Sequence, residues 1–191
     1  MKYLHALGIS ALSLVMLAAC NQQTQSSVGD IPAATPTASA TAPTATAAVQ
    51  KLTSANGKLS LETTGQFTDQ LAQANQLISD IPTEQLLLLQ NDTSNDVLIY
   101  AADLGAAKAD ANTYLAKLSD SVKADAKLQQ VVVGSVQNNK LAYQFSETVG
   151  DNAVNQACQA VHQQNIYSVC AISTTQNPEA LAGMIQNISV Q

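Results

Sequence analysis

Three cysteines and one histidine are the residues in this sequence whose types and positions point to chemistry. Cys20 directly follows a run of apolar residues near the start of the chain. Cys158 and Cys170 lie 12 positions apart near its end, with His162 between them. A cysteine can accept lipid, form a disulfide or attack a substrate, and a histidine can act as a general base. The surrounding sequence decides among these roles.

The first 20 residues are typical of a bacterial lipoprotein signal peptide. Lys2 supplies a positive charge, and an apolar run follows from residue 6 to residue 19. This run of about 14 residues is shorter than the roughly 20 that cross a bilayer core. It ends in Leu17-Ala18-Ala19-Cys20, which matches a lipobox, the motif in which the cysteine sulfur accepts diacylglycerol and becomes the new N-terminus. We predict a signal peptide over residues 1–19 and lipidation at Cys20; an ordinary secretory peptide cleaved after Ala19 is the alternative.

Lipidation predicts a location at the periplasmic face of a membrane, because two or more acyl chains form a stable anchor. The residue after the lipidated cysteine bears on which membrane this is. An Asp there favours the inner membrane in enteric bacteria, and this chain has Asn21. Asn21 therefore favours the outer membrane.

Residues 20–50 have the composition of a disordered linker. Ala, Thr and Pro dominate, and Asp30 is the single charged residue. Such a segment has too little apolar surface to offset the entropy of ordering it. We predict a lipidated cysteine followed by a linker whose root-mean-square reach is about 30 Å.

Residues 51–191 predict a single α+β domain in which an antiparallel sheet of hairpins is covered by helices. Asn56-Gly57 indicates a hairpin turn, and Asn177-Pro178-Glu179 indicates the start of a helix. Alternating polar and apolar residues indicate strands, and apolar residues spaced by three or four indicate helices. We expect strands over 58–62, 86–89, 97–100, 128–137, 140–149, 153–162 and 166–174, and helices over 65–81, 111–122 and 177–188.

Cys158 and Cys170 are expected to form a disulfide. If the hairpin between them turns through residues 163–165, the two cysteines lie directly opposite each other on adjacent strands. Opposed Cα atoms are about 4.5–5.5 Å apart, within the range that a disulfide spans. With Cys20 lipidated, these are the two remaining cysteines, and an oxidising compartment favours a disulfide between them. The bond would raise the free energy of unfolding by about 3 kcal/mol. A redox dithiol is disfavoured because the C-x-x-C spacing is absent.

The sequence contains no motif that indicates a catalytic, metal or cofactor site. His162 is the one histidine outside the predicted signal peptide. It lies next to a predicted turn and is interpreted as a solvated hairpin residue, since no partner residues can be chosen for it. Asp92, Asn95 and Asp96 could suggest a Ca²⁺ loop, but they lack the glycine of an EF-hand and are interpreted as a plain hairpin turn. The glycines form no phosphate-binding or nucleophile-elbow pattern. We therefore expect no enzyme and no cofactor.

The charge pattern excludes nucleic acid as a partner. All eight basic residues are Lys, and the formal net charge is -6. Nucleic-acid binders place clustered Lys and Arg against phosphates, often with aromatic residues that stack on bases. Neither feature is present here. The sequence does not predict an oligomeric state.

Several short motifs, in order, resemble those of the DcrB family of envelope lipoproteins. This resemblance implies a PsbP-like α-β-α sandwich, a link to bacteriophage sensitivity and no catalytic residue. Family members at the inner membrane carry Asp after the lipidated cysteine, whereas this chain has Asn21. The motifs are the lipobox, the Ala/Thr/Ser tether, Asn56-Gly57-Lys58-Leu59-Ser60-Leu61, Phe67-Thr68-Asp69-Gln70, Tyr114-Leu115-Ala116-Lys117-Leu118 and Asn187-Ile188-Ser189-Val190-Gln191.

The sequence as a whole favours a tethered interaction domain without catalytic activity. Its expected partners are the membrane, through lipid on Cys20, and an envelope protein that the sequence does not identify. An envelope hydrolase with His162 as its base is one alternative. A carrier of a small apolar ligand is another, and it would need a cavity of a few hundred Å³ between sheet and helix.

Overall fold

The computed structural model describes residues 49–78 and 80–191. The predicted signal peptide, Cys20 and nearly all of the predicted linker lie outside these residues. The first described strand begins at Val49, two residues before the predicted start of the domain.

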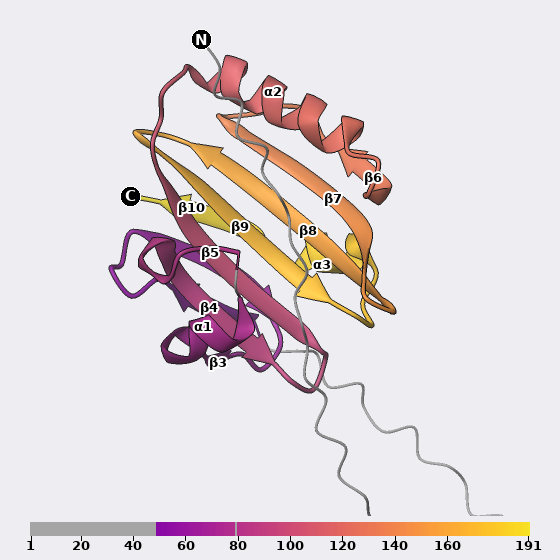
Figure 1. Ribbon diagram of the computed structural model, residues 1–191. Coiled ribbons are helices and arrows are strands. Elements are labelled where there is room, and N and C mark those ends of the chain that lie inside the picture. Colours follow the sequence, from indigo (N-terminus) through magenta and orange to yellow (C-terminus); the bar gives the residue numbers. More distant parts are fainter. Residues whose placement is uncertain (1–48, 79) are drawn as a thin grey trace, which may run out of the picture.

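A seven-stranded antiparallel sheet forms the centre of the domain (Figure 1). Its strand order is β3-β4-β5-β9-β8-β7-β6. Consecutive hairpins join β7 to β8 and β8 to β9, and β9 then pairs with β5. The strands are β3 (Thr68–Asp69), β4 (Leu86–Asp92), β5 (Val97–Ala106), β6 (Gln129–Val133), β7 (Lys140–Val149), β8 (Asn152–His162) and β9 (Asn165–Ser173).

A three-stranded sheet and helix α3 cover one face of the large sheet. This small sheet has the order β1-β2-β10 and consists of β1 (Val49–Thr53), β2 (Leu59–Thr64) and β10 (Gln186–Val190). Helix α3 (Pro178–Met184) is capped by Asn177, whose side chain accepts a hydrogen bond from the Ala180 amide. The Lys140 Nζ donates to the Ile188 carbonyl over 2.7 Å and so links β7 to β10.

The main hydrophobic core lies between these two layers. Every second residue of β9 points into it, including Tyr167, Val169 and Ala171. Leu59 and Leu61 enter from β2, as the alternating pattern of that strand requires. Burial of this apolar surface is the main favourable term in folding.

Two helical segments border the opposite face of the large sheet. Helix α2 (Ala111–Ala124) packs over β6 and β7, where Leu115 meets Leu141 and Ala160. At the other end, the short helix α1 (Ala74–Leu77) and the 3-10 turns η1 (Leu71–Gln73) and η2 (Thr83–Gln85) pack over β4 and β5. Antiparallel sheets with helices on them confirm the predicted α+β class.

The helix predicted over residues 65–81 is wrong. Within residues 65–78 and 80–81 the chain forms β3, η1 and α1, with four residues of α-helix. Gly65 has a φ of +148°, and the Gln66 and Phe67 amides bond to the side chains of Asp92 and Gln50. These tertiary hydrogen bonds hold the amides outside a helix, while Phe67 still reaches the core.

The closing helix and strand β6 are both shorter than predicted. Helix α3 ends at Met184, and Ile188 enters the core from β10 rather than from a helix. Asn187 has a φ of +51°, which fits an irregularity between Gln186 and Ser189 in the pairing of β10 with β2. Strand β6 ends at Val133, four residues before the predicted end.

Asp92 links the β4–β5 hairpin by hydrogen bonds to the segment that follows β2. Its side chain is 1% exposed. One carboxylate oxygen accepts from the Gln66 amide and the Asn95 Nδ2, and the other accepts from the Ser94 and Asn95 amides. Burial alone would raise the pKa of Asp92, but these hydrogen bonds outweigh it and hold the pKa below its ordinary value. Gly65 is required here because a Cβ would lie 2.6 Å from the Asp92 Oδ2.

Stability should therefore depend on the ionised form of Asp92. A carboxyl whose pKa is lower in the folded state stabilises the fold above its unfolded pKa of about 4, and this contribution is lost as the pH falls through the folded pKa. We expect Asp92→Asn to lower the free energy of unfolding at pH 7 by about 1–3 kcal/mol and to weaken its decline below pH 4. Urea unfolding at pH 7 and pH 3 measures both effects.

Asp120→Asn, an exposed change on α2, is the matched control and should leave both values near those of the unchanged protein. An Asp92→Asn variant with the same stability at pH 7 and the same acid dependence as the unchanged protein would contradict this role.

Candidate functional site

The disulfide and two tyrosines form one row across the face of the large sheet that α1 and α2 border. Tyr100 of β5 pairs with Cys170 of β9, Cys170 pairs with Cys158 of β8, and Cys158 pairs with Tyr143 of β7. Residues in register point to the same face. The two cysteines are joined by a disulfide, with their Cα atoms 4.1 Å apart, so the predicted pairing is confirmed.

A second row runs beside the first on the same face. Phe145 pairs with Gln156, Gln156 with Ile172, and Ile172 with Leu98. The rings of Tyr143 and Phe145 are stacked, with centroids 6.3 Å apart. We call this surface the disulfide face and define it by Tyr100, Tyr143, Phe145, Gln156, Cys158, Cys170 and Ile172.

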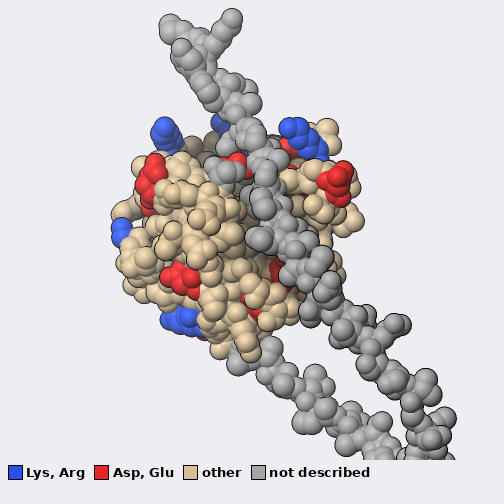
Figure 2. All heavy atoms as spheres, turned by 60° about the horizontal axis from the view of Figure 1, so that its bottom comes forward, with Lys and Arg blue, Asp and Glu red and all other residues tan. Residues whose placement is uncertain are grey.

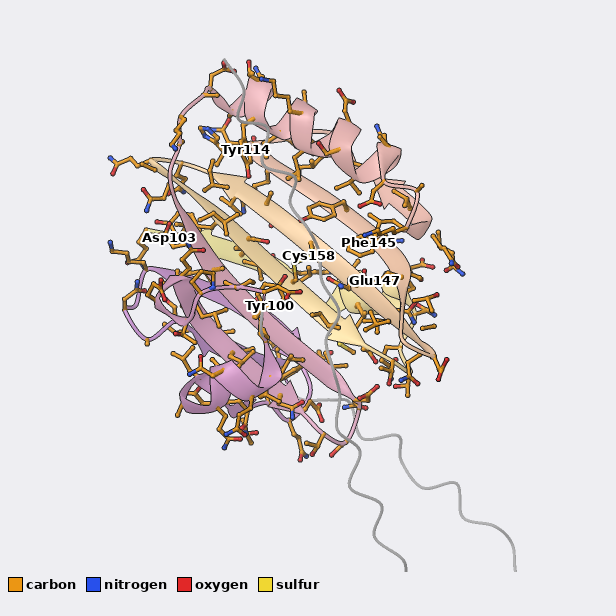
Figure 3. All side chains as sticks on the ribbon, in the orientation of Figure 1. Tyr100, Asp103, Tyr114, Phe145, Glu147 and Cys158 are labelled. Carbon is orange, nitrogen blue, oxygen red and sulfur yellow. A yellow bond between two sulfur atoms is a disulfide. The ribbon has the colours of Figure 1, made fainter. Side chains whose placement is uncertain are left out.

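The disulfide face lies in the band of sheet between α2 and α1. Figure 3 shows Tyr100, Cys158, Phe145 and Glu147 in this band, with Tyr114 above them under α2. Among the described helices, α2 covers the β6–β7 end and α1 covers the β4–β5 end, so neither lies over the middle of β9 (Figure 1). Tyr100, Tyr143, Gln156 and Ile172 are partly exposed, whereas Phe145, Cys158 and Cys170 are buried.

The phenol groups of this face stay neutral over the whole physiological range. Burial raises the pKa of Tyr143 to about 12, and a hydrogen bond with Ser168 only partly opposes this. Burial raises the pKa of Tyr100 as well, with smaller contributions from Tyr143 and Asp80. Both side chains therefore present an aromatic ring and an uncharged hydroxyl.

Glu147 is the acidic group at the edge of this face. Burial raises its pKa, and a hydrogen bond of 2.7 Å from the Gln156 Nε2 counteracts part of the rise. Asp125 adds to the rise through its negative charge. A carboxylate held in this way favours contacts with amides and hydroxyls over a role as an exposed charge.

His162 is buried, so its interpretation as a solvated hairpin residue is wrong. Its side chain is 8% exposed, and its Nε2 lies 2.8 Å from the Ala109 carbonyl. The carbonyl can only accept, so the Nε2 must carry the proton and is not a free base. The ring also approaches Tyr114, with centroids 6.0 Å apart. Strand alternation could have revealed this burial, because His162 shares a face with Cys158.

The β4–β5 turn is a plain hairpin, as predicted. Asp92 pairs with Val97 across it, and Asp92 bonds to the Ser94 and Asn95 amides. The Asp96 Oδ2 accepts from the Thr174 amide and hydroxyl. Both carboxylates thus serve the fold, and no group of three or more potential metal ligands occurs within residues 49–78 and 80–191.

Two of the hollows on the described surface could be compared with the cavity of a carrier, and neither matches it. One of about 190 Å³ lies between the β6–β7 edge and α3, where Val132, Ala142 and Ile185 line it. The other, of about 500 Å³, is a shallow opening beside Val49 and Phe67. The first is smaller than a ligand cavity of a few hundred Å³, and the second does not lie between a sheet and a helix.

Among the comparisons with known proteins, only the search of solved structures finds a likeness. No family model and no curated protein matches the chain. The fold is similar to the solution structure of cyanobacterial PsbP (CyanoP) from Synechocystis sp. PCC 6803, with a TM-score of 0.44 and 10% sequence identity. The match covers 81% of this chain and 99% of that chain. The resemblance to the DcrB family stays a prediction.

No helix among the described residues has the length and apolar character needed to cross a membrane.

Removing the disulfide should destabilise the domain without changing its fold. Cys158→Ala with Cys170→Ala opens a loop of 12 residues, and we expect a loss of about 3 kcal/mol in the free energy of unfolding. Urea unfolding of the oxidised protein and the double variant measures this loss. Reduction of the unchanged protein should lower its stability to a similar extent, and equal midpoints in all three samples would contradict the prediction.

Proposed function

We propose that this chain is a lipid-anchored periplasmic protein whose domain acts by binding another protein rather than by catalysis. The single observation that supports the location best is the use of the cysteines. Cys158 and Cys170 are bonded to each other, so Cys20 has no cysteine left to pair with in its own chain. Its position directly after the apolar run then fits lipid attachment.

The disulfide also fits this location. Such bonds persist in the periplasm and are rare in the reducing cytosol. The tether between Cys20 and β1 would let the domain search the space near the membrane, over a reach of about 30 Å. Asn21 favours the outer membrane, while the resemblance to the DcrB family favours the inner one.

The disulfide face supports the binding role. Its partly exposed side chains are those of Tyr100, Tyr143, Gln156 and Ile172. Tyrosine is enriched in protein interfaces. Charged side chains are sparse and scattered over the visible surface in Figure 2. A neutral surface of this kind suits an uncharged protein segment better than nucleic acid or an ionic substrate. A role in phage sensitivity, as in the DcrB family, is consistent with such a partner.

The hydrolase alternative has less support from the geometry. Its one candidate base, His162, is buried and uses its Nε2 to bond the Ala109 carbonyl. The described hydrogen bonds give it no serine, threonine or cysteine to activate. We therefore propose no catalytic residue and no cofactor.

Lipidation can be tested by replacing Cys20. We expect the unchanged protein to incorporate a labelled fatty acid and to sediment with membranes, and Cys20→Ser to lose the label and to become soluble in the periplasm or to keep its signal peptide. Fractionation, labelling and intact mass measure these outcomes.

The matched control is Ser26→Ala, a small change in the same segment, which should leave labelling and fractionation unchanged. A Cys20→Ser protein that remained labelled, or an unchanged protein with Cys20 present as a free thiol, would contradict the proposed anchor.

A further inference from the structure

Strand β6 is an open edge of the seven-stranded sheet. In the described part of the chain it pairs with β7 alone and lies at the end of the strand order (Figure 1). The backbone amides and carbonyls on the free side of an edge strand can pair with a strand from another chain. Native proteins commonly prevent such pairing with very short edge strands, with charged side chains or with groups that cover the edge.

The other three edge strands of the described sheets carry such protection. Strand β3 has only two residues. Strand β1 has an exposed charge, Lys51, at its centre. On β10, the Ile188 carbonyl accepts from the Lys140 Nζ over 2.7 Å, and the Val190 carbonyl accepts from the Gln163 Nε2 over 3.4 Å. The free side of β6 has neither a charge nor a hydrogen-bond partner among the described residues.

The hydrogen bonds of β6 with β7 show which of its backbone groups face outward. The Gly134 amide donates to the Ala142 carbonyl over 2.9 Å, and Val132 lies two residues before Gly134 in the same ladder. In an antiparallel pair, residues whose amide and carbonyl face the partner strand alternate with residues whose groups face away from it. Gly134 and Val132 therefore face β7, and the amides and carbonyls of Val131 and Val133 point to the free side.

Val132 is the exposed apolar residue of this edge. Its side chain is 55% exposed and lies on the face of the sheet that α3 covers, beside the hollow of about 190 Å³. All five residues of β6 are uncharged, and three of them are valine, which favours strands. Gln130 has a φ of +52° at an irregularity in the pairing with β7, so the regular part of the edge is the stretch of three valines.

This stretch of valines is complementary to itself. Antiparallel pairing of two copies about Val132 puts Val131 of each copy opposite Val133 of the other. These are the residues whose backbone groups face outward, so each of the two pairs can exchange two hydrogen bonds. The two Val132 side chains then lie opposite each other, with Cβ atoms about 4.5–5.5 Å apart, and cover each other's exposed surface. No like charges meet, because the strand carries none.

We propose that two copies of this chain associate through β6, which joins their large sheets into one continuous antiparallel sheet across a two-fold axis. The contact is short compared with standard protein interfaces, so the dimer is weak and forms where the chain is concentrated. The pairing does not use the disulfide face. It therefore goes beyond the proposed binding role and does not depend on it.

Cysteine crosslinking tests the register of this dimer. The protein is the chain of residues 20–191 with Cys20→Ser, so that lipidation plays no part in the result. Val132→Cys places the Cα atoms of the two substituted residues about 4.5 Å apart, a distance that a disulfide spans. Gln129→Cys, at an exposed position of the same strand, is the matched control, because residue 129 of one copy would lie about 20 Å from residue 129 of the other. We expect mild oxidation to give on the order of tenfold more covalent dimer from Val132→Cys than from Gln129→Cys.

A charge at the same position tests the association without a crosslink. Val132 is exposed, so Val132→Lys should leave the fold intact while it places two like charges opposite each other. We expect the sedimentation coefficient of the Cys20→Ser chain to rise with protein concentration. Adding Val132→Lys should hold it at the monomer value, and adding Gln129→Lys should preserve the rise.

Several results would overturn the proposal. In the crosslinking experiment these are equal amounts of covalent dimer from the two cysteine variants, or none from Val132→Cys. In sedimentation they are a Cys20→Ser chain that stays monomeric at every concentration, or a rise with concentration that survives Val132→Lys.

Discussion

The pairing of β8 with β9 is the constraint on which the rest of the structure depends. Cys158 lies directly opposite Cys170, and the disulfide between them allows one register. A slip of one residue would turn every side chain of a strand to the other face of the sheet. Because these strands occupy the middle of the seven-stranded sheet, their register sets the two faces for β5 and β7 as well.

The two faces that result have different surroundings. One carries Val169 and Ala171 into the main core, where the small sheet and α3 cover them. The other carries the disulfide with Tyr100 and Tyr143, between borders formed by α1 and α2. The same alternation that builds a stable core thus leaves a neutral aromatic surface on the opposite side. The binding role that we propose uses that surface and does not require organised charge.

Local patterns predicted the parts of the fold that local interactions determine. The hairpins, helix α2 and the disulfide follow from alternation, helical spacing and the symmetry of one turn. The helix predicted over residues 65–81 failed because distant residues decide that segment: Asp92 and Gln50 capture the amides of Gln66 and Phe67. Hydrogen bonds between residues this far apart in the chain leave no periodic signal in the sequence.

The candidate site was likewise predicted only where residues close in the sequence determine it. The cysteine pair was found from spacing, because two residues equidistant from a turn must meet. The row that joins Tyr100 to Tyr143 was not predicted, since it requires the order of four strands, and β5 pairs with β9 across some 70 residues of sequence. His162 was misassigned because proximity to a turn suggested exposure, while the Ala109 carbonyl that buries it lies 53 residues away.

The most direct measurement is photo-crosslinking in intact cells from two adjacent positions of β7. A photoreactive phenylalanine at position 143 lies on the disulfide face, and one at position 142 points to the opposite side of the sheet, where Ala142 is exposed. We predict adducts of position 143 with one recurring envelope protein that are absent from position 142. Equal adducts from both positions, or none from position 143, would contradict the account.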